Sequence, residues 1–341
     1  GGNFVYGIYS QSDIYNSAVI SNTAEECDGC NNRATGTISI KDDNTSSEIY
    51  GMYNSSENNI YNSFSFGTGQ GATKNGSEGS IIITKSETSS GNIIGMQGGK
   101  NLYNAYANTS DGVNTNVRAV GKINITHNGY GDVIGIRGTN SAGKINNALA
   151  YLNSAVSDAV AEGSIVLSGK GNVYGIYGNG TIANSETQFN KNYNMLKDFS
   201  SHGVIDVTTR SDTAAAYGIY AAGAKDTKTS VYNAMGYNST GDIKVRNTSG
   251  GSAFGIYSAA QTYTGDDDVV YYNNTYNAFR SSAIYGDSVA TGNIDMTIEG
   301  YSSLGQQVAG IYAAGNAFNS YANSGSDVML ETIGNITINE I

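Results

Sequence analysis

Short clusters of apolar residues, separated by polar segments, recur along the whole chain in a fixed order of three. The first cluster has the form of Tyr6-Gly7-Ile8-Tyr9, with glycine second and Ile or Met third. It occurs eight times, at 6–9, 50–53, 94–97, 134–137, 174–177, 217–220, 254–257 and 309–312. Successive glycines of this cluster are 37 to 55 residues apart, too regular for chance. The pattern therefore predicts eight degenerate repeats of one structural unit.

The second and third clusters complete the repeat. The second is typically an aromatic residue or Ile, then Asn, then a small residue, as in Tyr61-Asn62-Ser63. The third has the form Gly-x-Ile-x-Ile, as in 79–83, and a version of it occurs in every repeat. Apolar residues two positions apart indicate a strand with one buried face, and segments such as 168–172 carry the residues of turns. Each repeat is predicted to hold three short strands joined by turns and variable loops.

Alternation along a strand predicts which letters of the first cluster face the core. The first and third letters, such as Tyr174 and Ile176, are apolar in all eight repeats and are expected to point inward. The fourth letter is Tyr, Gln97 or Arg137, a mixture expected of an exposed position. This leaves a row of outward tyrosines as a candidate binding surface: Tyr9, Tyr53, Tyr177, Tyr220, Tyr257 and Tyr312.

Two architectures accept a β repeat of about 40 residues, a solenoid and a propeller of eight four-stranded units. The repeat between Gly218 and Gly255 leaves only residues 235–240 between its second and third clusters, too few for a fourth strand. The longest insertion, about 258–291, is tolerated as a lateral loop of a stack. The expected fold is all-β, a single parallel β-solenoid over 1–341, with the eight-unit β-propeller as the alternative. Its repeats begin near 5, 49, 93, 133, 173, 216, 253 and 308.

Composition narrows the class of partner. The net charge is −11, the pI is near 4.6, and no run of Lys or Arg provides a basic stripe. Nucleic acid and anionic membranes are therefore poor partners. No apolar run approaches the roughly 20 residues that span a bilayer, so no membrane insertion is expected. With no signal peptide before Gly1, the chain is interpreted as a mature product or an excised fragment.

The repeats resemble those of a known group of proteins. Strings such as 171–177, Gly-Asn-Val-Tyr-Gly-Ile-Tyr, and 215–220, Ala-Ala-Tyr-Gly-Ile-Tyr, look like the degenerate repeats of bacterial autotransporter passenger domains and related large surface adhesins. The resemblance covers all eight repeats. It implies a right-handed β-helix, exported to an extracellular or cell-surface location, with a structural or adhesive role.

Few residues point to metal or redox chemistry. Cys27 and Cys30 are the only cysteines and are interpreted as a small-loop disulfide, because the flanking acidic residues disfavour a reactive thiolate. Asp266, Asp267 and Asp268 form a carboxylate cluster inside the longest insertion, interpreted as a solvated loop with calcium binding as the weaker alternative. We therefore expect no metal and no cofactor.

A catalytic role is not expected either. His127 lies just after a predicted strand and His202 just before one, and both are interpreted as surface turn histidines. Clustered carboxylates with a nearby Arg or Lys, which a polysaccharide lyase would need, do not stand out.

The favoured function is a structural or adhesive surface stalk or fibre. Outward tyrosines could stack on sugar rings, although stacking on one another along the solenoid is the favoured interpretation. A carbohydrate-binding or polysaccharide-cleaving β-helix module is the alternative, with surface glycans or a host surface as partners. The chain begins with a first cluster at 6–9 and stops on a third cluster at 334–338. We therefore expect head-to-tail self-association, or a parent chain that continues beyond both ends.

Overall fold

The computed structural model describes residues 3–21, 31–43, 47–67, 73–86, 89–110, 115–139, 143–154, 157–189, 198–222, 230–259, 261–262, 270–271, 274–281, 289–300, 306–323 and 330–341. Within these ranges, three parallel sheets of eight strands each account for almost the whole fold. Every repeat contributes one strand to each sheet and forms one turn of the solenoid, which we call a rung.

The three sheets collect the three strands of the repeats in order. Sheet A holds the first strands: β1 (Phe4–Ser10), β4 (Glu48–Asn54), β7 (Ile93–Gly98), β10 (Val133–Gly138), β13 (Val173–Gly178), β16 (Ala216–Ala221), β19 (Ala253–Ser258) and β24 (Val308–Ala313). Sheet B holds the second strands: β2 (Ile14–Ser21), β5 (Ile60–Gly67), β8 (Leu102–Thr109), β11 (Lys144–Leu152), β14 (Thr181–Phe189), β17 (Ser230–Met235), β22 (Asn274–Ser281) and β25 (Ala317–Asn323). Sheet C holds the third strands: β3 (Asn31–Asp42), β6 (Thr73–Lys85), β9 (Thr115–His127), β12 (Asp158–Gly169), β15 (Phe199–Thr209), β18 (Ser239–Asn247), β23 (Val289–Ile298) and β26 (Glu331–Glu340).

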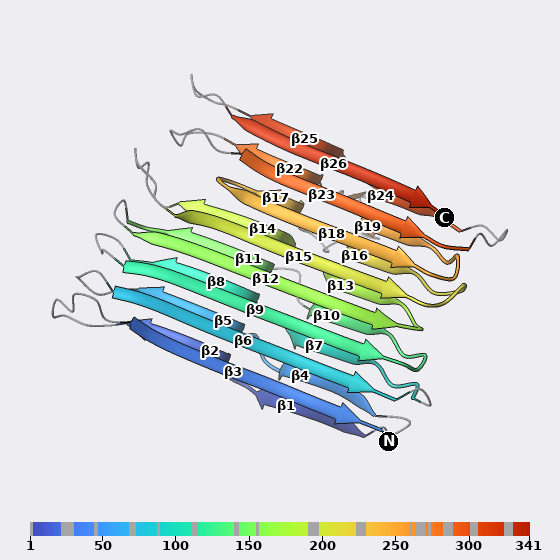
Figure 1. Ribbon diagram of the computed structural model, residues 1–341, viewed down its shortest axis with the longest axis horizontal. Helices are drawn as coiled ribbons and strands as arrows, with labels where there is room; N and C mark the ends of the chain where they lie inside the picture. The colour runs from blue at the N-terminus through green and yellow to red at the C-terminus, as the bar shows by residue number, and fades with distance from the viewer. Residues whose placement is uncertain are drawn as a thin grey trace.

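Every strand of the three sheets pairs in parallel with the equivalent strand of the next repeat. Figure 1 shows the long strands of sheet C in front, with sheets A and B side by side behind them, as the chain climbs in a right-handed path from the N-terminus to the C-terminus. The predicted β-solenoid is confirmed. The propeller is excluded, because its blades would pair strands within one repeat.

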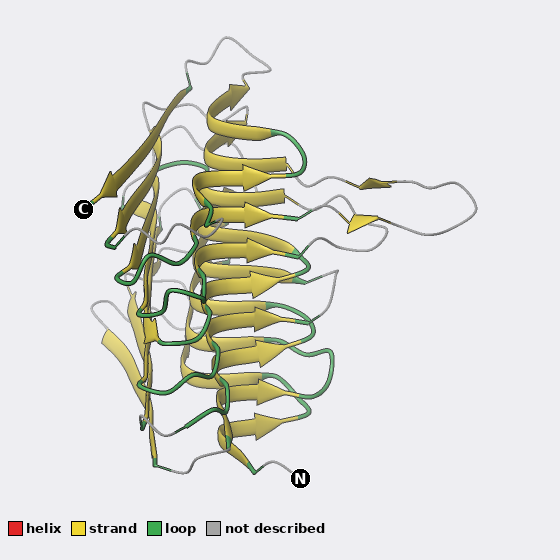
Figure 2. Ribbon diagram, turned by 90° about the vertical axis from the view of Figure 1, so that its right-hand side faces the viewer, coloured by secondary structure: helices red, strands yellow, loops and turns green. Residues whose placement is uncertain are grey.

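One element departs from the stack. The short strands β20 (Gln261–Thr262) and β21 (Val270–Tyr271) pair antiparallel inside the longest insertion. Figure 2 shows this ribbon projecting sideways from the body, away from the stacked strands. The insertion leaves the solenoid axis undisturbed, as expected of a lateral loop.

The third letter of the first cluster forms the predicted ladder of buried side chains. Register pairs these residues from rung to rung along sheet A. The six inner members have no exposed surface, and the two terminal members, Ile8 and Ile311, are partly buried against the same core. The inner members are Met52, Met96, Ile136, Ile176, Ile219 and Ile256.

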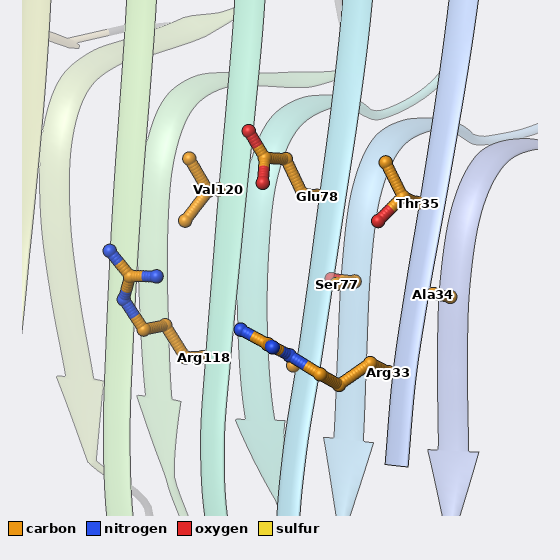
Figure 3. A pocket seen from close by; sticks show the side chains of 8 residues that line it. Arg33, Ala34, Thr35, Ser77, Glu78, Arg118 and Val120 are labelled. Carbon is orange, nitrogen blue, oxygen red and sulfur yellow. The ribbon is translucent and has the colours of Figure 1, made fainter.

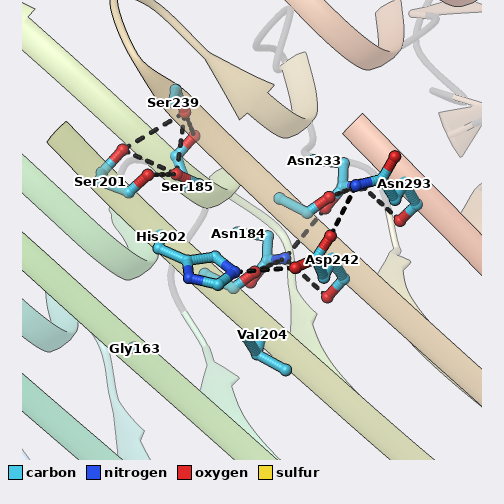
Figure 4. A network of polar contacts seen from close by, with 12 residues as sticks. Gly163, Asn184, Ser185, Ser201, His202, Val204, Asn233, Ser239, Asp242 and Asn293 are labelled. Carbon is cyan, nitrogen blue, oxygen red and sulfur yellow. Dashed lines mark hydrogen bonds and ion pairs between the residues drawn. The ribbon is translucent and has the colours of Figure 1, made fainter. Parts of the chain in front are cut away.

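Sheets B and C are held together by small side chains. Alanines and serines line the space between sheet B and the first half of sheet C, where Ser63 Oγ lies 2.7 Å from Ser77 Oγ. Ser185 Oγ lies 2.7 Å from Ser201 Oγ and 2.8 Å from Ser239 Oγ, as Figure 4 shows. Each of these buried serine hydroxyls thus has a partner, which offsets the cost of taking it out of water.

The Asn of the second cluster forms a continuous hydrogen-bonded column. In each pair of successive rungs, Asn Nδ2 donates to the next Asn Oδ1 at 2.8–2.9 Å. The same nitrogen lies within hydrogen-bonding distance of the carbonyl oxygen of the third-cluster glycine in its own rung. The column is Asn16, Asn62, Asn104, Asn147, Asn184, Asn233, Asn277 and Asn319.

This asparagine column explains the glycine that opens every third cluster. A Cβ at Gly163 would overlap the carbonyl oxygen and carbon of Asn147, and the equivalent glycines meet their own asparagines in the same way. Sheets B and C therefore approach closely at this point only because the glycine carries no side chain.

The first cluster does not alternate strictly, and the inward orientation predicted for its first letter is wrong. Register pairs Tyr50 with Ile94 and Met52 with Met96 but skips Gly51. A Cβ on Gly51 would overlap Ile81, a core residue, so the second and third letters both face inward. The local kink turns the first letter outward, beside the fourth, where Tyr50 and Tyr53 pack together outside the main core.

Substituting alanine at Gly163 should destabilise the fold by at least about 2 kcal/mol, because the new methyl group has no space beside Asn147. The matched control is Gly76→Ala in the neighbouring part of sheet C, where a Cβ meets nothing within 4 Å. Chemical denaturation of the two variants measures the difference. Equal midpoints for both would contradict the close approach.

Replacing Asn147 by Asp should cost about 3–5 kcal/mol, because an isosteric carboxylate cannot donate to the three oxygens around the amide and is buried unpaired. Those oxygens belong to Gly163, Asn184 and Val204. Asn124→Asp, on the exposed face of the same solenoid, is the control and should leave the melting temperature almost unchanged. Similar melting temperatures for the two variants would show that the column is not stabilising.

Candidate functional site

The outer face of sheet C carries many polar side chains. Alternate residues of its strands point outward, so equivalent positions line up along the solenoid axis. Near the N-terminal rungs these positions carry several cations, and further along they carry mainly carboxylates and amides. The face is therefore polarised in charge along its length.

The cationic end contains a hollow above a glycine. Register pairs Arg33 of β3 with Gly76 of β6, and Gly76 with Arg118 of β9. Because Gly76 has no side chain, the space between the two arginines is open. One hollow here has a volume of about 250 Å³ and also includes Thr35 and Glu78. In Figure 3 the side chain of Arg33 is directed from β3 toward Arg118.

A second hollow adjoins the first along the strand direction. It has a volume of about 420 Å³ and shares Arg33, Gly76 and Arg118 with its neighbour. Lys74 and Asn116 are among its other lining residues. The two hollows together form a shallow trough over the strands of three rungs, and Asp158, Val160 and Asp198 of the next two rungs line the far side of the second hollow. Repeat alignment reveals this trough, because Arg33, Gly76 and Arg118 each lie three residues before the glycine of the third cluster.

Ion pairs neutralise only part of the positive charge at the trough. Arg118 binds Glu162 at 2.8 Å, and Lys122 binds Glu78 at 2.6 Å. The hydrogen bond from Lys122 holds the pKa of Glu78 below its usual range. All four side chains are substantially exposed, so these pairs add little to stability. Among the described residues, Arg33 has no carboxylate partner.

The predicted row of tyrosines lies on the outer face of sheet A, on the opposite side of the solenoid from the trough. Tyr9 and Tyr312, at the two ends, are 51% and 43% exposed, and the inner members are half-buried. Their rings stack on one another at centroid distances of 4.8–5.6 Å. Gln97 interrupts the row, and so does Arg137, whose guanidinium lies 5.8 Å from the centroid of the Tyr177 ring.

The first letters of the cluster form a second column beside this row. Tyr174 stacks on Tyr217 at 4.9 Å, and Tyr217 on Phe254 at 5.1 Å. Burial among these rings raises the pKa of Tyr217 to about 12. Sheet B has a similar column, in which Tyr15, Tyr61 and Tyr103 stack in turn. Ring faces along the columns thus pack on other rings, which is the favoured interpretation of the sequence.

Several candidate residues lie outside the described part of the chain. These are Cys27 and Cys30, the predicted disulfide, and Asp266, Asp267 and Asp268, the weak calcium candidate. Among the residues that the structure describes, no three His, Cys, Asp or Glu side chains are grouped so as to hold a metal ion. No helix in the same part of the chain is long and apolar enough to cross a membrane.

The two histidines occupy different environments, and the surface interpretation of His127 is wrong. His127 is the last residue of β9 and has no exposed surface. Its Nδ1 accepts a hydrogen bond from the Gly129 amide at 2.9 Å, and its Nε2 lies 3.0 Å from the Gly91 carbonyl oxygen. These contacts fit a neutral ring protonated at Nε2. Burial is the main reason that the pKa of His127 is lowered.

His202 is half-exposed on the outer face of sheet C. Its Nε2 lies 2.8 Å from Asp242 Oδ2, and Asp242 Oδ1 accepts a hydrogen bond from Asn293 at 2.7 Å, as Figure 4 shows. The hydrogen bond to Asp242 raises the pKa of His202. The Asp242 carboxylate therefore lies between the His202 ring and the Asn293 amide. A Ser-His-Asp arrangement would also need a serine hydroxyl bonded to the His202 ring, and none of the described residues supplies one.

Comparisons of the chain with models of known protein families, with curated proteins and with solved structures gave no match.

Stability should fall as the pH drops below about 6.5, the ordinary pKa of histidine, because the unfolded chain then binds a proton at His127 that the folded chain resists. The raised pKa of His202 acts in the opposite direction, giving stability below about pH 6.5 that is lost as the pH rises, but its exposure makes that effect small. Chemical denaturation at pH 7.5 and 5.0 gives the free energy of unfolding at each pH, and the difference is the sum of the two histidine contributions.

The variant His127→Gln keeps one donor and one acceptor but cannot titrate, so it should lose most of this pH dependence. His202→Gln is the control and should retain it. If both variants keep the same pH dependence as the parent protein, the buried histidine is not its source.

Proposed function

We propose that this chain is a structural and adhesive element of an extracellular or cell-surface fibre, in which copies of the solenoid stack head to tail. The observation that supports this most directly is the state of the last rung. Ile336 and Ile338 of β26 are 37% and 43% exposed, whereas their partners Ile294 and Met296, one rung earlier, are 1% and 0% exposed. One further rung, from a second copy or from a continuation of the chain, would remove this apolar surface from water.

The asparagine column makes the two end rungs complementary. Asn319 Nδ2 donates to the Gly334 carbonyl, and among the described residues no further asparagine lies beyond it to accept a second bond. At the first rung, no described residue donates to Asn16 Oδ1, although Asn16 Nδ2 donates onward to Asn62. A donor at one end thus matches an acceptor at the other.

The sheets have the same complementarity. The outer edges of the first-rung strands, β1 to β3, and of the last-rung strands, β24 to β26, are unpaired within the described chain. Such edges are templates for another strand. Contact between unlike ends is heterologous and therefore propagates into a filament.

The surface location and the adhesive role are proposed from the resemblance of the repeats to passenger domains and surface adhesins. We propose no catalytic activity and no cofactor. Glycans on an opposing surface are the proposed partners, and they would be contacted by the lateral faces, because the end faces are taken up by stacking.

The 341-residue chain should form elongated oligomers at micromolar concentration, measured by light scattering and electron microscopy. Ile336→Asp places a charge on the stacking face and should leave the particle monomeric, while its circular dichroism spectrum should show that the strands remain folded. Ile82→Asp adds the same charge to the outer face of sheet C, where Ile82 is 41% exposed, and should assemble normally. A strictly monomeric parent protein would overturn the proposal, as would normal assembly of Ile336→Asp.

A further inference from the structure

We propose that the trough over Gly76 binds a carboxylate-bearing sugar unit of an acidic polysaccharide. This inference rests on the proposed adhesive function, because it assigns a ligand class to one lateral face of the fibre.

The first argument is the local reversal of charge. The chain as a whole carries −11, but Arg33, Lys74, Arg118 and Lys122 lie close together on three successive rungs. The two ion pairs of this region involve Arg118 and Lys122. Arg33 and Lys74 have no carboxylate partner among the described residues and remain available to an anion.

The second argument is the shape of the surface. Arg33 and Arg118 lie two rungs apart, which for parallel strands is roughly 9–10 Å between backbones. Gly76 lies between them, and its missing side chain opens the floor of the trough. Almost any other residue would fill that space. The guanidinium group is a planar fork that matches a carboxylate, so a carboxylate seated over Gly76 can reach both arginines.

The uncharged polar side chains of the lining favour a sugar over a simple ion. Thr35 lines the first hollow, and Asn31 and Asn116 line the second. Their hydroxyl and amide groups can both donate and accept hydrogen bonds, as sugar hydroxyls require. The volumes of about 250 and 420 Å³ suit one or two ring-sized units. The side chains stand on strands of a rigid sheet, which limits the entropy lost on binding.

Charge further along the face sets the direction of the ligand. Asp158 and Asp198 line the second hollow on the side of the next two rungs, and Glu162 lies beside Arg118, so a polyanion laid along the solenoid axis would be repelled. The two hollows instead adjoin along the strand direction. The polysaccharide therefore crosses the solenoid from side to side, with one acidic unit held over Gly76.

The binding test uses the full chain and oligogalacturonate, with calorimetry at low and moderate salt. Arg33→Gln removes the unpaired guanidinium, and Gly76→Glu places a carboxylate in the trough. Each should weaken binding at least tenfold. Lys244→Gln makes the same charge change as Arg33→Gln on the same face, five rungs further on, and should bind like the parent protein. Unchanged melting temperatures of the variants verify folding.

Three results would overturn the proposal. One is the absence of oligogalacturonate binding, and a second is binding that Arg33→Gln and Gly76→Glu leave intact. The third is binding of a heparin oligosaccharide without binding of oligogalacturonate, which would assign the trough to sulfate. Neutral dextran should not bind. Fibre assembly by Ile336→Asp and its control is measured separately, so failure of the ligand assignment and failure of the fibre proposal are distinguishable.

Discussion

Parallel stacking in register places each residue directly against its counterpart one rung away, and this self-contact is the constraint on which the rest of the structure depends. An asparagine amide is well suited to contact with an identical residue. Its NH2 group donates a hydrogen bond in one direction along the axis, and its oxygen accepts one from the other direction. The column from Asn16 to Asn319 uses this property in the interior, where an unpaired polar group would be costly. Aliphatic residues satisfy it by dispersion and burial, and aromatic residues satisfy it by stacking.

Residues of like charge cannot repeat in this way inside the solenoid, because they would repel one another from rung to rung. At the corner between sheets C and A, successive rungs instead carry different residues at one position. Asp42, Lys85 and His127 occupy one position on three successive rungs. Lys85 has no exposed surface, and its ammonium donates to the carbonyl oxygen of Gly91 in the turn after β6 and to that of Ser47 in the turn after β3. Burial lowers the pKa of Lys85. Each of the three residues bonds a neighbouring turn, so the position tolerates different chemistry on successive rungs.

The repeats allowed the fold to be predicted from the sequence, but features that depend on local backbone geometry could not be predicted in the same way. Eight copies of one spacing predicted three strands per repeat, and the third letter of the first cluster identified the core ladder. The first letter was assigned to the wrong face, because the kink at Gly51 breaks the alternation on which the assignment depended. The asparagine of the second cluster was visible in every repeat, but a column of amides follows only once the strands are known to stack in register. The trough required the same knowledge, since Arg33, Gly76 and Arg118 are more than 40 residues apart in sequence.

The direction of the bonds between rungs has a mechanical consequence. Inter-rung hydrogen bonds run along the solenoid axis, so a pull on the two ends loads each interface between rungs in series rather than shearing strands past one another. Every interface that opens releases one repeat of the chain. A repeat of about 40 residues extends to roughly 130–145 Å, against roughly 5 Å when stacked. A tether built from such rungs would lengthen in steps and dissipate work at each one.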